Sequence, residues 1–232
     1  MNVLAFDTCF DACSVAAGRG MRSLSPVIAT SFAPMALGQA ERLLPMIDEV
    51  MSEAKLSFKD LDRIAITTGP GTFTGARICV AAARALALVS GTPVVTISSL
   101  ALMARHPDIP GDKIRGLAIA TDARRGEVYV QHIDRHTLEP LSPPAVYAVT
   151  DVAAALGHGP IAVAGSGAKS LVEEAKAQGI AAIAILPELL PDALDMLFCA
   201  ASWQPESPVA PLYLRAPHAK PPARSPFAGA HA

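Results

Sequence analysis

A loop rich in glycine and threonine is the segment of this sequence whose residue types best suit a chemical role. It reads Gly69-Pro70-Gly71-Thr72-Phe73-Thr74-Gly75, is followed closely by Arg77, and stands between an expected strand and an expected helix. Backbone amides, hydroxyls and the positive end of a helix dipole all favour an anion such as phosphate. The same glycines would also allow a sharp turn capped by threonine. The loop is not a Walker A motif, so both interpretations stay open.

Two aspartates, Asp7 and Asp122, each close the first strand of an expected hairpin. If they face each other across a cleft, they could hold a metal, polarise water or hydrogen-bond a hydroxyl. Aspartate is also common in hairpin turns that have no such duty. Asp122 also belongs to a charge cluster with Arg124, Arg125 and Glu127, which favours an interface or a structural ion pair.

Metal ligands and catalytic nucleophiles are harder to find. His132 and His136 have the spacing of a helical zinc pair, but they follow a strand pattern, which would set them about 13 Å apart. The serines lack the Gly-x-Ser-x-Gly elbow, and no cysteine has an evident histidine partner. We therefore expect no metal site and no catalytic residue in this chain.

The composition indicates a folded chain with a hidden surface. Of 232 residues, 51% are hydrophobic and 17% are charged, which indicates a folded chain. The net charge of -2 argues against a protein that binds nucleic acid through its overall charge. The four cysteines lack Cys-x-x-Cys spacing, which favours free thiols. No apolar run approaches the roughly 20 residues of a membrane span and no signal peptide is readable, so we expect a cytoplasmic protein with no membrane contact. A partner that covers one surface would explain the excess of alanine, valine and leucine.

One plan of elements recurs in the two halves of the chain. Each half has a hairpin, then a strand, a glycine loop and a helix. In the first half the hairpin is 3–6 with 13–17, the strand 64–68, the loop 69–75 and the helix 77–89. In the second half the hairpin is 117–121 with 127–133, the strand 161–164, the loop 165–167 and the helix 168–178. The repeat predicts a duplicated α/β fold of two lobes with a cleft between them.

The lobe boundary is expected within 105–113, where prolines and a glycine interrupt the pattern. We assign 1–105 to the first lobe, with its partner-binding helices, and 106–204 to a second, smaller lobe whose last helix could pack back on the first. Residues 205–232 are rich in proline and carry Arg215, Lys220 and Arg224 without an acid beyond Leu214. We expect them to form a flexible, solvated tail rather than an RNA contact.

Two helices in the first half differ in character. Residues 39–54 have apolar side chains at helical spacing on one face and charges on the other, as in an ordinary amphipathic helix. Residues 78–89 are apolar almost all round. By itself this favours a central helix, buried on more than one side, over an oligomer contact.

These motifs together resemble the TsaB (YeaZ-like) family, the dimerisation subunits of the bacterial machinery that makes N6-threonylcarbamoyladenosine in tRNA. The resemblance rests on the stretches Val3 to Thr8 with Ser14-Val15, Glu41 to Pro45, Gly69 to Arg77, Ser98 to Leu100, Asp122 to Tyr129 and Pro211 to Arg215. It implies the two-lobed actin and hexokinase-like (ASKHA) fold, with mixed sheets flanked by helices. It also implies a non-catalytic scaffold that pairs with the paralogous transferase TsaD, joins the ATPase TsaE and reaches tRNA only through that complex.

The resemblance further assigns partner binding to the two first-lobe helices, which would pair with TsaD or, in the free protein, with a second copy. The expected contact residues are Leu43, Leu44, Ile47, Met51, Ile78, Ala81, Ala82, Ala85 and Leu86. No cofactor is expected on this chain alone, and ATP or ADP would bind only at the interface with TsaD or TsaE. TsaD-type proteins hold metal through a His-x-x-x-His pair, and this chain has Gln39 and Arg42-Leu43 in that stretch.

The alternative is an enzyme in its own right, an actin-like ATPase or a small-molecule kinase that uses Asp7 and the loop 69–75. Such an enzyme needs a full nucleotide pocket in the second lobe. Here the corresponding loop is reduced to Gly165-Ser166-Gly167-Ala168, which disfavours this reading.

Overall fold

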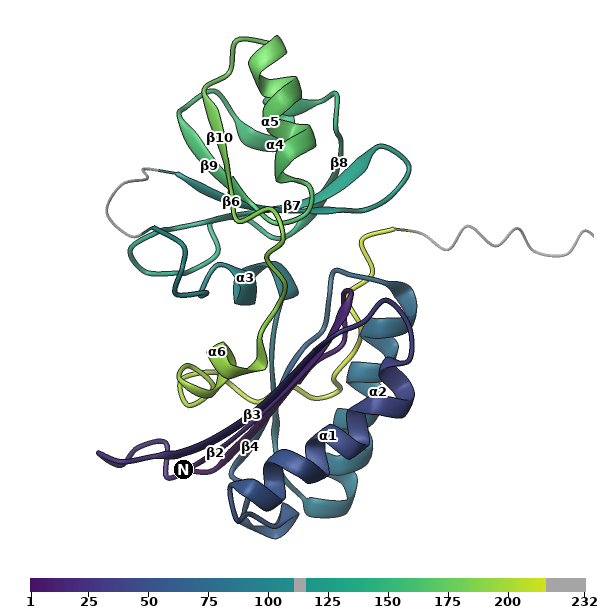
Figure 1. Cartoon of the computed structure of the whole chain (residues 1–232), viewed down its shortest axis with the longest axis vertical. Helices are drawn as coiled ribbons and strands as arrows, with labels where there is room; N and C mark the ends of the chain where they lie inside the picture. Colours follow the sequence, from purple (N-terminus) through teal and green to yellow (C-terminus); the bar gives the residue numbers. More distant parts are fainter. Residues whose placement is uncertain (111–115, 216–232) are drawn as a thin grey trace, which may run out of the picture.

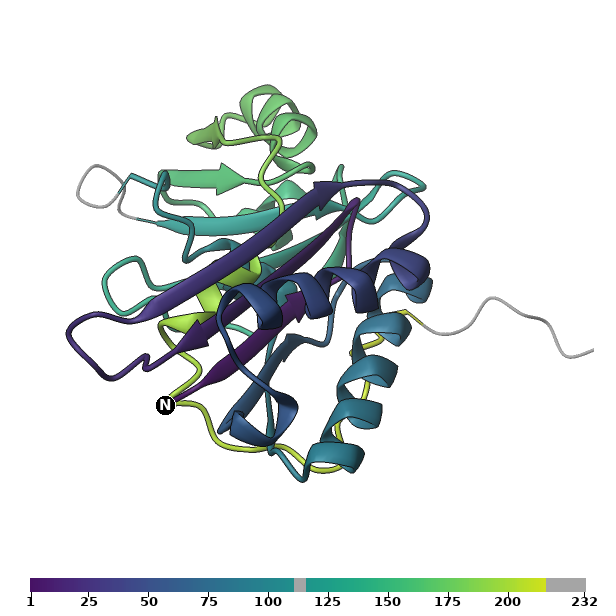
Figure 2. The same ribbon diagram turned by 60° about the horizontal axis from the view of Figure 1, so that its bottom comes forward.

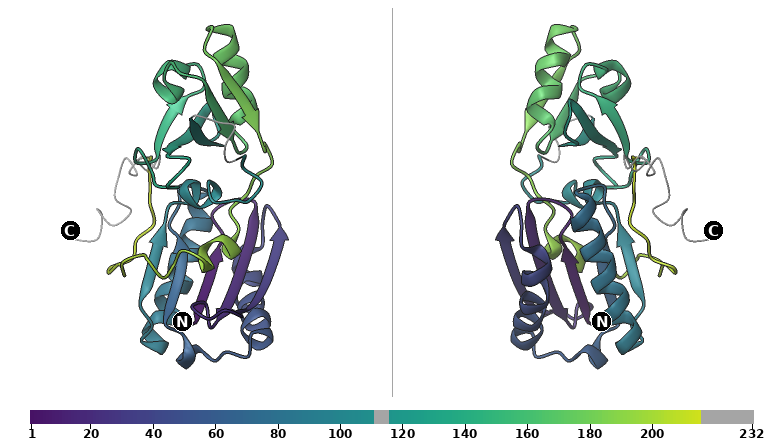
Figure 3. Two further views of the ribbon diagram at one scale, coloured as in Figure 1. Left: turned by 90° about the vertical axis from the view of Figure 1, so that its left-hand side faces the viewer. Right: turned by 90° about the vertical axis from the view of Figure 1, so that its right-hand side faces the viewer.

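The computed structural model describes residues 1–110 and 116–215, which fold as two lobes with the same order of elements (Figure 1, Figure 3). Lobe 1 contains β1 (Val3–Asp7), β2 (Ala12–Arg19), β3 (Val27–Pro34), α1 (Gln39–Glu53), the 3-10 turn η1 (Phe58–Asp60), β4 (Arg63–Thr67), α2 (Phe73–Ser90), β5 (Val94–Ile97) and α3 (Ser99–Met103). Lobe 2 contains β6 (Leu117–Asp122), β7 (Glu127–Ile133), β8 (Ala145–Ala148), α4 (Val152–Leu156), β9 (Ile161–Ala164), α5 (Ala168–Ala177), β10 (Ala182–Ile185) and α6 (Ala193–Leu197).

The two sheets have one topology. The strand order is β3-β2-β1-β4-β5 in the first and β8-β7-β6-β9-β10 in the second. In each sheet a three-stranded antiparallel meander is extended by two parallel strands. This repeat confirms the predicted duplicated, two-lobed ASKHA fold.

Strand β1 lies at the centre of lobe 1 and is buried on both faces. Leu4 and Phe6 belong to the core shared with α1 and α2, whereas Val3 and Ala5 belong to the core shared with α6. Successive side chains of a strand point to opposite faces, so an unbroken apolar run is what a strand between two helical layers requires. Figure 2 shows α1 and α2 side by side on one face of the sheet.

The last helix of each lobe packs against the other lobe. Helix α3 follows β5 of lobe 1 but contacts β6 and β7, and its Leu100 and Met103 share a core with Leu117 and Ile119. Helix α6 follows β10 of lobe 2 but contacts β1 and β2. Through this exchange each sheet gains its second helical layer, and the lobes interlock.

Residues 205–215, which we call the strap, run along the edge of the first sheet. Pro205 bridges to Val95 of β5, and the amide of Leu212 donates to the carbonyl of Thr68 at 2.8 Å. This differs from the expected flexible tail, because an extended segment can satisfy the free backbone groups of an edge strand even when it is rich in proline. The basic residues Lys220 and Arg224 lie outside the described residues.

Helix α2 departs from two expectations. Its 18 residues have a mean hydropathy of 1.4, long and apolar enough by length and composition to cross a membrane, although no such run was expected. A helix packed on a sheet of its own chain meets the same test, and α2 contacts β4 and β5. It is also not central: Gly75, Ala76, Cys79, Val80 and Ala83 are its only buried residues.

The glycine loop brings the start of α2 against the turn between β1 and β2. A Cβ at Gly71 would lie 2.3 Å from the carbonyl oxygen of Cys9, and one at Gly75 would lie 2.0 Å from that of Thr8. The amide of Thr72 donates to the carbonyl of Cys9 at 2.7 Å, and the Thr72 hydroxyl caps the helix by accepting from the Gly75 amide at 3.0 Å. Close backbone packing therefore accounts for these two glycines without a bound anion.

Replacing Gly75 by alanine tests this packing. In a free helix alanine would be favoured over glycine by about 1 kcal/mol. Here the added methyl group meets backbone, so we expect Gly75→Ala to lower the free energy of unfolding by about 2 kcal/mol, measured by urea denaturation. Gly159→Ala is the control, because its Cβ would meet nothing within 4 Å. Equal stability of the two variants would contradict the close approach.

Candidate functional site

A cleft of about 280 Å³ lies between the lobes. Lobe 1 contributes Phe10, Asp11, Gly71 and Thr72; lobe 2 contributes Asp122, Ala123, Arg124, Tyr129 and Ser166; and residues 187–190 complete the lining. The cleft thus brings together two residues of the predicted anion loop and two of the predicted charge cluster. The remaining loop residues do not line it.

Hydrogen bonds of its backbone amide and of its carboxylate hold Asp122 on the cleft wall. Its amide donates to the Ser166 hydroxyl at 3.0 Å, and its carboxylate accepts from the Arg124 amide at 2.7 Å. The Arg124 guanidinium lies 3.8 Å from the same carboxylate. These contacts are typical of a capped hairpin turn that presents charge to solvent.

Asp7 does not face Asp122 across the cleft, contrary to one of the two expectations. It is fully buried, accepts from the Cys9 amide at 3.1 Å and from the Thr67 hydroxyl, and does not line the cleft. Burial raises the pKa of its carboxyl to about 6, with a smaller increase from the negative charge of Asp192, while the two hydrogen bonds oppose the shift. Its hydrogen bonds join the β1–β2 turn to the end of β4.

The charge cluster forms internal ion pairs that involve the strap. Arg215 pairs with Glu127 and also donates to the carbonyl of Arg124 at 3.3 Å. Its guanidinium lies 5.9 Å from the centre of the Tyr129 ring. Glu127 of the cluster therefore forms a structural ion pair, as expected, and the cation is Arg215, which lies 88 positions away in the sequence.

An exposed aromatic stack lies where the strap passes the start of α2. The rings of Phe73 and Tyr213 are 5.2 Å apart between centroids and inclined by 30°. The Arg77 guanidinium lies 4.9 Å from the centre of the Phe73 ring. Phe73 and Arg77 were expected to serve an anion loop or interface; Tyr213 was quoted only within a motif, and nothing in its local pattern pointed to Phe73.

The helical face expected to bind a partner is only partly available. Leu43, Ile47 and Met51 are 1, 1 and 3% exposed, because they form the core between α1 and the sheet. Assigning them to a partner contact was wrong for the folded chain, since a helix cannot present its core-facing stripe outward. Ile78, Ala82 and Leu86 are half-buried against the same core.

The outward residues of α1 and α2 form what we call the docking face: Leu44, Ala81, Ala85, Leu88 and Val89. Leu44 is 56% exposed, and Leu88 and Val89 are each 86% exposed. Ala81 and Ala85 are also exposed. Sequence periodicity could have separated Leu44 from Leu43, but hydrophobicity alone does not tell which side of α2 meets the sheet.

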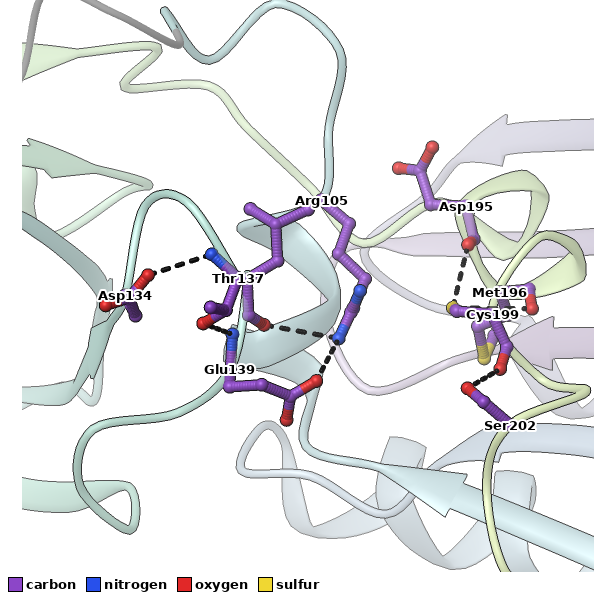
Figure 4. A network of polar contacts seen from close by, with 9 residues as sticks. Arg105, Asp134, Thr137, Glu139, Asp195, Met196, Cys199 and Ser202 are labelled. Carbon is purple, nitrogen blue, oxygen red and sulfur yellow. Dashed lines mark hydrogen bonds and ion pairs between the residues drawn. The ribbon is translucent and has the colours of Figure 1, made fainter.

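Arg105 ties the linker between the lobes to the segment that follows β7 (Figure 4). It donates to the carbonyl of Leu138 at 3.2 Å, lies 3.6 Å from the Glu139 carboxylate, and stacks 6.0 Å from the Trp203 ring centre. Burial raises the pKa of nearby Cys199 to about 11, so its thiol is protonated at neutral pH and donates to the Asp195 carbonyl. The Arg105 contacts therefore join the linker to lobe 2, whereas the Cys199 hydrogen bond lies within one turn of the chain.

The predicted absence of a metal remains a prediction. Within residues 1–110 and 116–215 no three histidine, cysteine, aspartate or glutamate side chains are grouped to hold an ion. The ring Nε2 of His132 lies 2.9 Å from the Ala155 carbonyl oxygen. Gln39 is buried, and its side-chain amide donates to the carbonyls of Met35 and Phe10, so it serves the start of α1.

Comparison with known proteins places this geometry in a family. The family model described as "TsaD: tRNA N6-adenosine threonylcarbamoyltransferase" matches residues 36–204. The "tRNA threonylcarbamoyladenosine biosynthesis protein TsaB" of Escherichia coli (strain K12) is 36% identical over 129 residues, which are 56% of this chain and 53% of that protein. An uncharacterized protein of Mycobacterium tuberculosis (strain ATCC 25618 / H37Rv) is 36% identical over 95% of this chain and 94% of its own length.

A solved structure agrees with the sequence matches. YeaZ from Pseudomonas aeruginosa superposes with a TM-score of 0.76 at 29% identity, covering 92% of this chain and 99% of that one. The chain belongs to the TsaB (YeaZ) family. TsaB relatives are named for the biosynthesis of threonylcarbamoyladenosine in tRNA, and the E. coli match spans about half the length of each protein.

In this TsaB-family chain the titration of Asp7 predicts a pH-dependent stability. The folded pKa of about 6 exceeds the ordinary 3.8. The stability that Asp7 contributes is therefore complete below about pH 4 and is lost as the pH rises through 6. Asp195, raised to about 7 mainly by burial, acts in the same direction.

We expect Asp7→Asn to reduce this dependence. Between pH 4.5 and 7.5 the free energy of unfolding should fall by about 2 kcal/mol less in the variant than in the wild type, because the buried charge no longer forms. Urea denaturation at both pH values measures the difference. Asp11→Asn, at an exposed position, should follow the wild type. Parallel pH profiles for Asp7→Asn and wild type would contradict a buried, titrating Asp7.

Proposed function

We propose that this chain is a non-catalytic dimerisation subunit that pairs, in the cytoplasm, with a TsaD-type transferase for threonylcarbamoylation of adenosine in tRNA. The observation that carries the proposal is the docking face. Leucine and valine side chains that are 86% exposed near the end of an 18-residue helix leave apolar surface in water. Ala81, Ala85, Leu88 and Val89 recur at i, i+4, i+7 and i+8, so they share one side of α2, and an exposed apolar stripe of this kind marks an interaction surface in soluble proteins.

A partner of the same fold suits this face. The alanines Ala81 and Ala85 leave room for another helix to approach closely, Leu88 adds apolar surface on the same side of α2, and Leu44 adds an exposed leucine on α1. A TsaD-type chain, whose family model matches residues 36–204 here, would offer equivalent helices. In its absence a second copy of this chain could occupy the same self-complementary face, which gives a homodimer.

The proposal assigns the chemistry to the partner. Gln39 and the Arg42-Leu43 pair replace the metal ligands that the family resemblance attributes to TsaD, and Gln39 is engaged with backbone carbonyls. Cys199 is held in its protonated, poorly nucleophilic form. The ATPase TsaE would join the assembly, and ATP or ADP would bind at an interface with TsaD or TsaE.

A single charge in the docking face should break the pair. We expect Ala85→Glu to abolish co-purification with a co-expressed TsaD-type transferase, because burying an unpaired carboxylate in an apolar contact is strongly unfavourable. Ala154→Glu makes the same substitution at an exposed position of α4 in lobe 2 and should leave pairing intact. Circular dichroism and sizing confirm that both variants are folded. Unchanged pairing of Ala85→Glu would refute this surface.

The stand-alone ATPase or kinase alternative depends on the interlobe cleft. Its volume of about 280 Å³ lies just below the roughly 300–1,000 Å³ of small-molecule sites and is small for a whole nucleotide, although a pocket of about 590 Å³ shares its lining residues 187–190. We therefore expect no micromolar binding of magnesium ATP to the isolated chain by titration calorimetry. We also expect no threonylcarbamoyladenosine in tRNA incubated with the chain alone, by mass spectrometry of the digested RNA. Micromolar binding of magnesium ATP, or modified adenosine in tRNA incubated with the chain alone, would favour the enzyme alternative.

A further inference from the structure

We propose that the start of α2 and the end of the strap form a surface that binds unpaired nucleotides of an RNA. We call this the stacking surface; it comprises Phe73, Arg77, Tyr213, Arg124 and Arg125. This inference rests on the proposed function in one respect: the complex proposed there has tRNA as its substrate. It adds a contact between RNA and this chain, which the docking face does not require.

The first support is the aromatic stack itself. Phe73 is 60% exposed and Tyr213 is 48% exposed, although both are large apolar rings and lie 5.2 Å apart. Phe73 comes from α2 and Tyr213 from the strap. The two segments lie side by side because the Leu212 amide donates a hydrogen bond to the carbonyl of Thr68, just after β4. Planar rings that project into solvent are the platforms on which proteins stack unpaired bases.

The second support is the charge around the stack. Arg77 lies over the Phe73 ring, and Arg124 and Arg125 are exposed on the hairpin that Arg215 contacts from the strap. Among the residues that the structure describes, neither Arg77 nor Arg125 takes part in an ion pair. Arginine next to aromatic rings combines phosphate contacts with stacking.

The nearby acids cancel part of this charge. Glu127 is paired with Arg215, and the Asp122 carboxylate lies 3.8 Å from the Arg124 guanidinium. Arg77 and Arg125 remain without an acidic partner among the described residues, on a chain whose net charge is -2. Arginines beside aromatic rings favour a polyanion as the ligand. A neutral protein surface could bind to the rings alone and would not need the arginines.

Binding to two labelled RNAs by fluorescence anisotropy tests the proposal. One RNA is a hairpin with an unpaired loop, and the other is a fully paired duplex of the same length. The full-length chain should bind the hairpin more tightly than the duplex, because only unpaired bases can stack on Tyr213. Tyr213→Ala should weaken hairpin binding about tenfold, since stacking contributes about 1–3 kcal/mol per base and 1.4 kcal/mol is a factor of ten.

Matched variants separate stacking, charge and folding. Tyr213→Phe keeps the ring and should retain the affinity. Arg77→Ala should weaken hairpin binding and reduce the slope of log K against log salt by about 0.7. Arg22→Ala removes an exposed arginine from the loop between β2 and β3 and should change neither affinity nor slope. Thermal denaturation checks that each variant is folded.

Two results would overturn the proposal: equal affinity for hairpin and duplex, or unchanged hairpin binding by Tyr213→Ala. If Tyr213→Ala lowered only co-purification with the transferase, the stack would belong to the protein interface and the proposal would be wrong. Ala85→Glu distinguishes this failure from failure of the proposed function. It should lose the partner and keep hairpin affinity, because the docking face and the stacking surface use different residues.

Discussion

The approach of α2 to the β1–β2 turn is the constraint on which the rest of the molecule depends. Two glycines, Gly71 and Gly75, let the helix start lie against the backbone of Thr8 and Cys9, where a Cβ would not fit. That contact fixes which side of α2 meets the sheet, and so which side carries Leu88 and Val89 outward. It also fixes the position of Phe73, against which Tyr213 of the strap stacks. The docking face and the stacking surface thus both include residues of α2, whose orientation this backbone contact sets.

The repeated order of elements was predictable because hydrophobic period and glycine placement are local signals. The strands 127–133 and 161–164 were predicted with the bounds that the structure has. The edge strand β3 and the helix α3 were not predicted, and the last helix of the second lobe was predicted without bounds. Segments of five residues such as α3 and α6 carry too few turns for a periodic signal, and β3 is exposed on alternate residues at the sheet edge. Their stability comes from tertiary packing, which a local pattern cannot report.

The candidate site was predictable in its residue types and less so in its geometry. The loop 69–75 and the charge cluster do come together at the cleft, but the choice between an anion loop and a tight turn depended on the distances at Gly71 and Gly75. Leu43, Ile47 and Met51 failed as contact residues because an apolar residue on an amphipathic helix fits the core as well as it fits a partner. Arg215 closes its ion pair with Glu127 across 88 positions of sequence, a contact that only the folded chain reveals.

The exchange of α3 and α6 also bears on how the chain is made. During synthesis the first sheet emerges early, but the helix that covers its second face is α6, encoded almost 100 residues after β5. Until Met196 and Leu197 leave the ribosome, Val3, Ala5 and Ala65 lack the cover that α6 provides on that side. A nascent chain of this kind exposes apolar surface for most of its elongation, and such transiently exposed surface is prone to aggregate unless a chaperone covers it.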